Sequence, residues 1–328
     1  MKVLFTGIQP TGLLHIGNYF GAIRNWVELQ HRFRSYISVV DLHAITIAYE
    51  AGEMPAAVFQ LALGLYACGI EMEKTILFVQ SEVPGHADLT WIFNTLTPLG
   101  DLERMTQFKD KAAQHRRNVN IGLLDYPVLQ AADILIYKAE VVPVGEDQVQ
   151  HVEFTREVAR RFNARYGDTF PECAAELTNT PRVMGLDGEA KMSKSKGNYI
   201  GLLESRDDIW PKLSVAPTDP ARVKRSDPGT PELCNIFSYH RLVTPEPELS
   251  EVVAKGCRRA GIGCLDCKRI FLGHLMEVLD PIRERHDRLA STPTRVREAL
   301  DRNAQTCRAD AARTMLEVKE KMGLTKIW

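Results

Sequence analysis

Short apolar runs alternate with longer segments of helical periodicity over the first half of this 328-residue chain. The apolar runs suit strands that are buried on both faces, and the periodic segments suit helices that connect one strand to the next. The predicted strands are 3–5, 36–40, 75–79 and 141–144, and the predicted helices are 17–33, 54–68 and 86–96. This alternation predicts an α/β fold built on a parallel sheet.

Polar residues follow several of the predicted strands. Gln9 follows the first strand, Asp41 and His43 follow the second, Gln80 follows the third, and Gly145 follows the fourth. In a parallel sheet, ligands bind beyond the carboxyl ends of the strands. We therefore expect a polar ligand site at this edge of the sheet.

The pattern changes after Asn198. Proline-rich turns separate segments that are mostly helical, and amphipathic patterns predict long helices at 262–289 and 294–321. With 45% apolar residues, the chain can fill the cores of two domains. The predicted domains are an α/β domain at 1–198 and an all-helical domain at 199–328.

Charge and cysteine content give weaker indications. The net charge of −1 does not point to nucleic acid, although Lys and Arg outnumber Asp and Glu after Glu251. That excess fits a polyanionic partner or an ordinary solvated helical surface. The first apolar run is too short for a signal peptide or a membrane span, so we expect neither. Seven cysteines in a chain of this size argue against a disulfide scaffold, and we expect a cytoplasmic location.

Two short segments, far apart in the sequence, both suit an anion. In His15-Ile16-Gly17-Asn18, the last two residues open a predicted helix whose free N–H groups favour negative charge. The run Lys191-Met192-Ser193-Lys194-Ser195 places two cations and two hydroxyls in a compact loop that can hold a polyphosphate. Each signal alone is weak, because a short Lys/Ser run is usually a solvated loop.

Together, in this order and at this separation, the two segments resemble the signatures of class I aminoacyl-tRNA synthetases. Three further segments resemble motifs of the tryptophanyl-tRNA synthetase family, over essentially the whole chain: Gly7-Ile8-Gln9-Pro10-Thr11-Gly12, Gln130-Ala131-Ala132-Asp133 and Gly145-Glu146-Asp147-Gln148. The resemblance implies a Rossmann-type catalytic domain at 1–198 and a helical anticodon-recognition domain at 199–328. It implies ATP-dependent activation of L-tryptophan and its transfer to tRNA.

The resemblance also assigns roles at the ATP site. The lysine loop would close over ATP and stabilise the pyrophosphate leaving group in the transition state, and Mg²⁺ would accompany the triphosphate. The implied catalytic residues are Lys191, Ser193, Lys194 and Ser195. Together with these four, the implied ATP-binding residues are Gln9, Pro10, Thr11, His15, Gly17, Asn18, Gly145, Glu146, Asp147, Val183, Met184 and Met192.

Asp133 is the residue that we expect to select tryptophan. It lies among apolar neighbours, where an unpaired carboxylate is costly, and an indole ring carries a hydrogen-bond donor and no acceptor. Phenylalanine would leave the carboxylate unpaired and would be rejected. The alternative is an aspartate that caps a helix or bonds a partner side chain. Secondary tryptophan contacts are expected from Tyr126, Gln130, His43 and Gln148.

Four cysteines, Cys234, Cys257, Cys264 and Cys267, have the spacing C-x22-C-x6-C-x2-C. Four thiolates suit either tetrahedral zinc or an iron–sulfur cluster, and four buried free cysteines remain an alternative. The spacing resembles a subset of tryptophanyl-tRNA synthetases with a [4Fe–4S] cluster in the anticodon-recognition domain, which we follow. Nearby cations would contact tRNA phosphates: Lys255, Arg258, Arg259, Lys268 and Arg269.

Other functions remain open at this point. A tyrosyl-tRNA synthetase has the same architecture but usually carries different loops at 7–10 and 145–148. An RNA-binding protein on a retired synthetase scaffold, or a nucleotidyltransferase that acts without tRNA, would not require both motifs and a large helical domain. The family resemblance implies a homodimer, and segments 99–108 and 121–137 could form its surface or pack internally.

Overall fold

The computed structural model describes residues 1–109, 119–145, 148–177 and 183–324. These residues contain a five-stranded parallel sheet with the strand order β3-β2-β1-β4-β5. The strands are β1 (Val3–Ile8), β2 (Arg34–Val39), β3 (Ile76–Val79), β4 (Val141–Val144) and β5 (Ala174–Leu177). The predicted parallel sheet is therefore confirmed.

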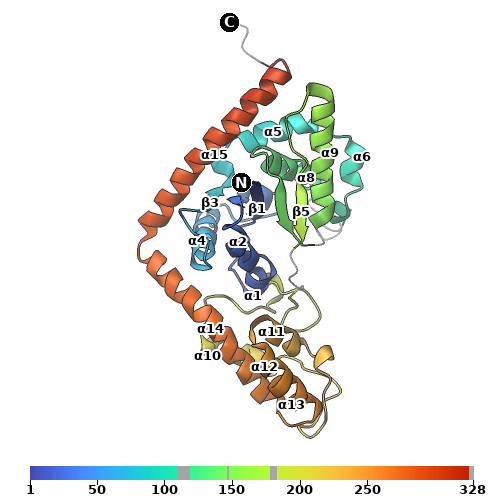
Figure 1. The fold of residues 1–328 in the computed structure, drawn as a ribbon, viewed down its shortest axis with the longest axis vertical. Coiled ribbons are helices and arrows are strands. Elements are labelled where there is room, and N and C mark those ends of the chain that lie inside the picture. The colour runs from blue at the N-terminus through green and yellow to red at the C-terminus, as the bar shows by residue number, and fades with distance from the viewer. Residues whose placement is uncertain (110–118, 146–147, 178–182, 325–328) are drawn as a thin grey trace.

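The helices of the first part of the chain surround this sheet (Figure 1). Their bounds are α1 (Ile16–Asn18), α2 (Arg24–Leu29), α3 (Asp41–Ala44), α4 (Met54–Ala67), α5 (Gly85–Asn94), α6 (Leu99–Glu103), α8 (Ile121–Leu135) and α9 (Val149–Tyr166). A π-helical turn at Tyr19–Ile23 joins α1 to α2 where the sequence predicts one continuous helix. Asn120 caps the start of helix α8: its side chain accepts a hydrogen bond from the backbone N–H of Leu123 at 2.9 Å.

Alternate residues of the strands face two separate cores. Ile37 and Val39 of β2 pack in the first core with α2, α4 and the later helix α14 (Cys264–Ala290), whereas Tyr36 packs in the second core with α5, α8 and α9. Phe78 of β3 and Val142 of β4 also face the second core. This period of two is what a sheet covered on both faces requires. Helix α8 is therefore a central helix of the second layer.

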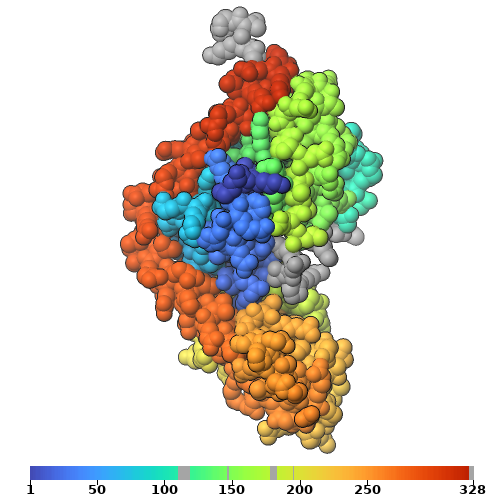
Figure 2. All heavy atoms as spheres, viewed as in Figure 1, coloured from blue at the N-terminus to red at the C-terminus, as the bar shows by residue number. Residues whose placement is uncertain are grey.

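The helices after residue 199 do not all lie together. Their bounds are α10 (Arg206–Val215), α11 (Asn235–Val243), α12 (Glu246–Glu248), α13 (Lys255–Arg258), α14 (Cys264–Ala290) and α15 (Pro293–Lys321). Figures 1 and 2 show α11–α13 in a lobe at one end of the molecule, while α14 and α15 lead back along the sheet domain. None of the described helices is both long and apolar enough to span a bilayer.

Helix α15 packs directly on the sheet domain. The side-chain amide of Asn303 donates to the carbonyl oxygen of Leu77 in β3 at 3.0 Å, and Cys307 and Met315 lie in the second core. Tyr36 of β2 donates its hydroxyl to Asp310 at 2.5 Å. Helix α15 therefore completes the second core of the sheet domain. The domain boundary near residue 198 stays a prediction.

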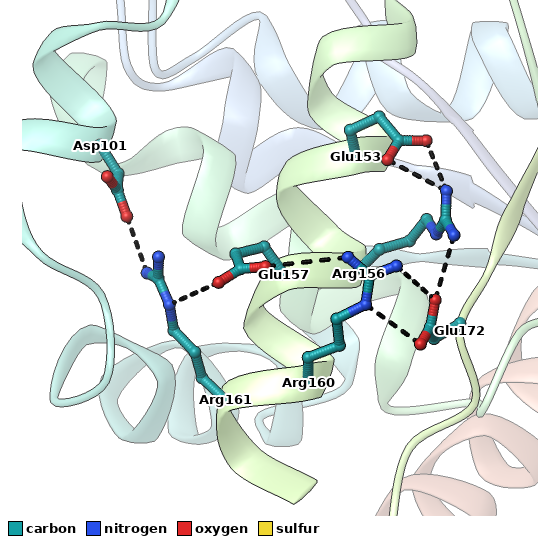
Figure 3. A network of polar contacts seen from close by, with 7 residues as sticks. All are labelled: Asp101, Glu153, Arg156, Glu157, Arg160, Arg161 and Glu172. Atoms are coloured by element: carbon teal, nitrogen blue, oxygen red, sulfur yellow. Dashed lines mark hydrogen bonds and ion pairs between the residues drawn. The ribbon is translucent and has the colours of Figure 1, made fainter. Parts of the chain in front are cut away.

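An ion-pair network fixes α9 to its neighbours (Figure 3). Arg161 pairs with Asp101 of α6 at 2.7 Å, and both Arg156 and Arg160 pair with Glu172, which precedes β5. Glu172 is exposed, so each single pair contributes little. Because the three arginines share carboxylate partners, we assign them to the fold.

Candidate active site

A cavity of about 1080 Å³ lies at the carboxyl edge of the sheet. Its walls come from the ends of β1 and β4, from α1 and α8, and from the lysine loop. The predicted residues that line it are Gln9, His15, Gly17, Asn18, His43, Tyr126, Gln130, Asp133, Gly145, Gln148, Val183, Lys191 and Met192. Pro10, Thr11, Met184, Ser193 and Lys194 are not among its lining residues. Glu146 and Asp147 lie outside the described residues.

The His15–Asn18 turn is compact, with His15 and Ile16 buried and Gly17 and Asn18 half-buried. Asn18 accepts a hydrogen bond from the backbone N–H of His15 at 3.1 Å. A Cβ atom on Gly17 would lie 2.9 Å from Nδ1 of His15 and 3.3 Å from Cβ of Met192, so only glycine allows this approach. Burial and the nearby charge of Lys191 lower the pKa of His15 to about 4. His15 is therefore neutral near pH 7.

Hydrogen bonds from its backbone N–H groups fix the position of the lysine loop. The N–H of Met192 donates to the carbonyl oxygen of Val183 at 3.2 Å, and the N–H of Ser193 donates to Oδ1 of Asn198 at 2.9 Å. Asn198 in turn donates to Asp187 at 2.7 Å. Lys194–Lys196 then form a single 3₁₀ turn. The backbone of the loop is thus fixed, while the side chains of its lysines remain exposed.

The two motifs meet in space. The N–H of Ile16 donates to the carbonyl oxygen of Ile200 at 2.9 Å, which joins the first motif to the chain that leaves the lysine loop. A Cβ atom on Gly12 would lie 3.1 Å from Cδ of Lys194. Lys191 lines the same cavity as Asn18. The cavity therefore presents the charge of Lys191 together with the start of α1, which suits a phosphate group.

Asp133 also lines this cavity; it lies on α8 and is 1% exposed. Its Oδ2 is 2.7 Å from Nε2 of His43, and its Oδ1 accepts from the side-chain amide of Gln80 at 2.7 Å. Oδ1 is also 2.6 Å from Nδ1 of His86. The carboxylate therefore has partner side chains, as the alternative interpretation of the sequence expected, and it still lines the cavity.

These partners keep Asp133 ionised. Burial alone would raise its pKa, but the hydrogen bonds and charges of His43 and His86 hold the pKa of the carboxyl well below its usual range. Nε2 of His86 is 2.8 Å from the hydroxyl of Tyr137, which fixes the ring from its other side. Gln80 could be expected near a ligand because it follows a predicted strand, whereas nothing in the sequence singled out His86.

Tyr126 stands beside this carboxylate site. Its hydroxyl is 2.9 Å from Nε2 of His151, and its ring is edge-on to His43 with 6.3 Å between the ring centroids. Burial raises the pKa of Tyr126 above its ordinary value, so the phenol is protonated. Tyr126 and His43 therefore supply a wall that is both aromatic and polar, as an aromatic amino-acid side chain requires.

The four cysteines lie far from this cavity, in the terminal lobe. Cys234 precedes α11, Cys257 is in α13, and Cys264 and Cys267 are in the first turn of α14. Burial and the neighbouring thiols raise the pKa of Cys267 to about 12. Among the described residues, no group of three or more His, Cys, Asp and Glu side chains is close enough to hold a metal ion.

One predicted phosphate contact is wrong. Lys268 is 3% exposed, and its ammonium donates to the carbonyl oxygens of Ser214 at 2.8 Å and Ala216 at 2.6 Å. The ammonium of Lys268 is buried because this turn of α14 packs against α10. Lys255 and Arg258 are exposed but pair with neighbouring carboxylates.

The fold and the two joined motifs define a class of nucleotide-dependent enzymes. The chain matches the family model of class I tRNA synthetases (W and Y) over residues 2–271. The chain belongs to this family, the class I aminoacyl-tRNA synthetases for tryptophan and tyrosine. The predicted fold class and enzyme class are therefore confirmed.

Within the family, the chain is similar to tryptophan–tRNA ligases over its full length. It is 53% identical to the enzyme of Deinococcus radiodurans over 100% of both chains, and 44% identical to that of Thermotoga maritima over 99% of both. A crystal structure of tryptophanyl-tRNA synthetase from Campylobacter jejuni, complexed with ADP and tryptophan, has a TM-score of 0.88 at 34% identity and covers 98% of this chain and 100% of its own. A tyrosyl-tRNA synthetase from Archaeoglobus fulgidus shares the fold alone, at 21% identity.

Proposed function

We propose that this chain activates L-tryptophan with ATP and transfers it to tRNA. The observation that supports tryptophan most is the acceptor capacity of Asp133. A carboxylate can accept about four hydrogen bonds, and Gln80, His43 and His86 supply three. That leaves about one acceptor position on a carboxylate that lines the cavity, and an indole N–H is a donor that fits it.

In the first step, the carboxylate of tryptophan attacks the α-phosphate of ATP, and pyrophosphate leaves. The substrate supplies the nucleophile, so the protein has only to orient two anions and stabilise the charge that develops. We assign this stabilisation to Lys191 and Lys194, with hydroxyl contacts from Ser193 and Ser195. In the second step, a hydroxyl of the terminal adenosine of tRNA attacks the adenylate, and AMP leaves.

The ATP-binding assignments remain as the sequence predicts them. Neutral His15 can donate a hydrogen bond to phosphate without adding a charge, and its Nδ1 has no hydrogen-bond partner among the described residues. Asn18 lies beside it, while the backbone N–H groups of Ile16 and Asn18 already donate to Ile200 and His15. We expect Mg²⁺ to enter as part of the ATP complex, since that ion bridges phosphate oxygens and keeps several waters.

Amino-acid-dependent exchange of pyrophosphate into ATP tests the proposed function. We expect exchange with tryptophan and none with tyrosine or phenylalanine. Exchange with tyrosine alone would make the chain a tyrosine enzyme. Absence of exchange with every amino acid, in protein that melts cooperatively, would indicate a retired scaffold and contradict the proposal.

We further propose a symmetric homodimer. Three large apolar side chains lie exposed on helices that pack on one another: Trp91 of α5 is 73% exposed, Leu99 of α6 is 60% exposed and Ile121 of α8 is 76% exposed. Apolar groups gathered in this way favour a protein interface. Most of segment 121–137 is buried in the second core, so only its first turn is available.

Light scattering tests the dimer. At micromolar concentration we expect twice the mass of one chain, and we expect Ile121→Glu to shift the protein toward the monomer because it places a charge in the apolar interface. Leu316→Glu, at an exposed apolar position of α15, is the matched control and should remain dimeric. A monomeric wild-type protein would contradict this proposal. In a dimer, each tRNA would bridge the two subunits.

We propose that Cys234, Cys257, Cys264 and Cys267 hold a [4Fe–4S] cluster, with zinc as the alternative at the same thiolates. Four thiols are the donor set that such a cluster takes, and these four are near enough to affect one another's titration. In this structure, however, the described side chains are not gathered closely enough to hold a metal ion, so the proposal requires the thiolates to draw together around it. Arg222 lies 3.7 Å from Sγ of Cys257, and Thr218 lies 3.7 Å from Sγ of Cys264. A bound cluster would brace the lobe for anticodon recognition, and activation would need no electron from it.

Metal analysis of protein purified anaerobically tests this assignment. We expect brown protein with ~4 iron and ~4 sulfide per chain, as the cluster formula requires. Cys264→Ser should lose the colour, whereas Cys307→Ser, at a buried cysteine of α15, should keep it. Stoichiometric zinc in protein purified from an iron-replete host would overturn the cluster assignment and make the four cysteines a zinc site. Absence of any metal would reject the site.

A further inference from the structure

His86 lies behind the active-site cavity and is not among its lining residues. It is in the first turn of α5 and is fully buried. Both of its ring nitrogens nonetheless have partners: Nδ1 is 2.6 Å from Oδ1 of Asp133, and Nε2 is 2.8 Å from the hydroxyl of Tyr137. These three side chains form a row, Asp133–His86–Tyr137, that leads from the cavity wall into the second core.

The neighbours of His86 determine which of its nitrogens carries a proton. An ionised carboxylate accepts hydrogen bonds and donates none, so Nδ1 carries a proton toward Asp133. Burial raises the pKa of Tyr137 far above its ordinary value, so the phenol keeps its proton and can donate it to Nε2 of a neutral ring. The hydroxyl therefore disfavours the tautomer in which Nδ1 would face the carboxylate without a proton.

Aromatic packing fixes Tyr137 in turn. Its ring is stacked on Tyr36 of β2 and on Phe5 of β1, with 4.4 and 5.9 Å between the ring centroids. It also meets Phe78 of β3 edge-on at 5.6 Å. Stacked and edge-on rings at such separations attract one another. Side chains from three strands of the sheet therefore set the position of the hydroxyl that orients His86.

The two oxygens of Asp133 have different surroundings. Oδ1 is bonded by His86 and Gln80, which are both fully buried and are not among the lining residues of the cavity. Oδ2 is bonded by His43, which does line the cavity. The row therefore holds Oδ1 on the protein side. Oδ2 has fewer partners among the described residues and lies on the side of the cavity, where a substrate donor arrives.

We propose that His86 is a positioning residue for the selection of tryptophan: it holds Oδ1 of Asp133 so that Oδ2 faces the indole N–H, and Tyr137 orients the ring that does so. His86 itself does not contact the substrate. This inference rests on the function proposed above, since an indole donor is the group that the remaining acceptor position serves. It makes the preference for tryptophan depend on residues behind the cavity wall.

Loss of the Nδ1 donor would also change the titration of Asp133. Burial raises the pKa of this carboxyl, whereas hydrogen bonds with His43 and His86 hold it well below its usual range. The other titratable groups that face the row are Tyr36 of β2 and Cys307 of α15. Burial raises the pKa values of both, that of Cys307 to about 12, so neither is charged near pH 7. Without His86, the pKa of Asp133 rises, and its negative charge is lost as the pH falls through the raised value.

The KM for tryptophan in ATP–pyrophosphate exchange, measured against pH, tests the inference. At about pH 8, we expect His86→Leu to raise this KM about tenfold or more with little change in kcat, because a charge-assisted hydrogen bond is lost from substrate binding. As the pH is lowered toward about 5, the ratio of the variant KM to the wild-type KM should grow, because Asp133 takes up a proton in the variant and stays ionised in the wild type.

His86→Asn separates the hydrogen-bond donor from the shape of the ring. The asparagine amide places an N–H donor where Nδ1 lies, and it does not titrate. We expect its KM for tryptophan to stay within a few-fold of the wild type, with a ratio that does not change with pH. An asparagine variant as weak as His86→Leu would show that only the shape of the ring matters, which would overturn the inference.

Tyr137→Phe covers the case in which His86→Leu does not fold. It keeps the aromatic stack and removes the hydroxyl, and we expect a KM for tryptophan about threefold or more above the wild type. Tyr166→Phe, at a half-buried tyrosine that packs against the same core, is the matched control and should keep the wild-type KM.

The outcomes distinguish this inference from the proposed function. Absence of tryptophan-dependent exchange in the wild type would overturn the proposed function, and this inference with it. Normal exchange in the wild type, together with a wild-type KM for tryptophan at every pH in both His86→Leu and Tyr137→Phe, would overturn this inference alone.

Discussion

Replacing Lys194 with alanine is expected to slow tryptophan-dependent ATP–pyrophosphate exchange by about 10²–10³-fold, with little change in the affinity for tryptophan. A charge that stabilises the leaving group acts mainly in the transition state, and loss of one such donor has an effect of this size. The backbone of the loop is fixed by Asn198 and Val183, so the variant should keep the loop in place. Exchange of labelled pyrophosphate at saturating tryptophan measures the effect.

Lys196→Ala is the matched control. Lys196 lies in the same 3₁₀ turn and is exposed, so its removal changes the net charge of the loop by the same amount. We expect its exchange rate to stay within a few-fold of the wild type, because surface charges at a distance are screened. Equal losses for the two variants would mean that the loop acts through net charge alone. Wild-type exchange by Lys194→Ala would reject the assigned role.

The sheet could be predicted because its strands are buried on both faces. The apolar run at β3 and the buried, mostly apolar run at β2, which Ser38 interrupts, leave few other structures open, and the polar residues that follow them mark the ligand edge. Strand β5 escaped prediction, because its four residues, Ala174–Leu177, are half-buried or exposed at the sheet edge and carry no apolar run. The π-helical turn at Tyr19–Ile23 has the same apolar spacing as an α-helix, so sequence periodicity does not distinguish them.

In the site, too, features encoded by neighbouring residues could be predicted, and features that depend on the packing of distant elements could not. The lysine loop and the His15–Asn18 turn are local motifs, and each forms a compact turn of its own. The role of His86 depends on where α5 lies relative to α8, which no local pattern encodes. The predicted phosphate contact of Lys268 was wrong for a related reason. A lysine on one face of α14 contacts solvent, whereas Lys268 lies on the other face and donates to buried carbonyl groups.

Asp133→Ala is expected to abolish measurable tryptophan binding, a loss of at least 10²-fold, while ATP binding survives. The substitution removes the acceptor for the indole N–H, and it also leaves His43, Gln80 and His86 without their shared partner in a buried site. Groups left unpaired in this way add their own desolvation penalty to the lost hydrogen bond. Equilibrium dialysis with labelled tryptophan and, separately, with ATP measures both affinities.

The controls for Asp133 separate recognition from folding. Asp133→Asn keeps the shape and one acceptor oxygen, and we expect it to fold like the wild type and to bind tryptophan more weakly. Asp125→Ala removes a half-buried carboxylate from the same helix, where it accepts from Asn94 at 2.9 Å, and should retain tryptophan affinity. Since phenylalanine offers no indole donor, the wild-type preference for tryptophan over phenylalanine should shrink in Asp133→Asn. Full tryptophan affinity in both Asp133 variants would reject the indole contact and return this carboxylate to a purely structural role.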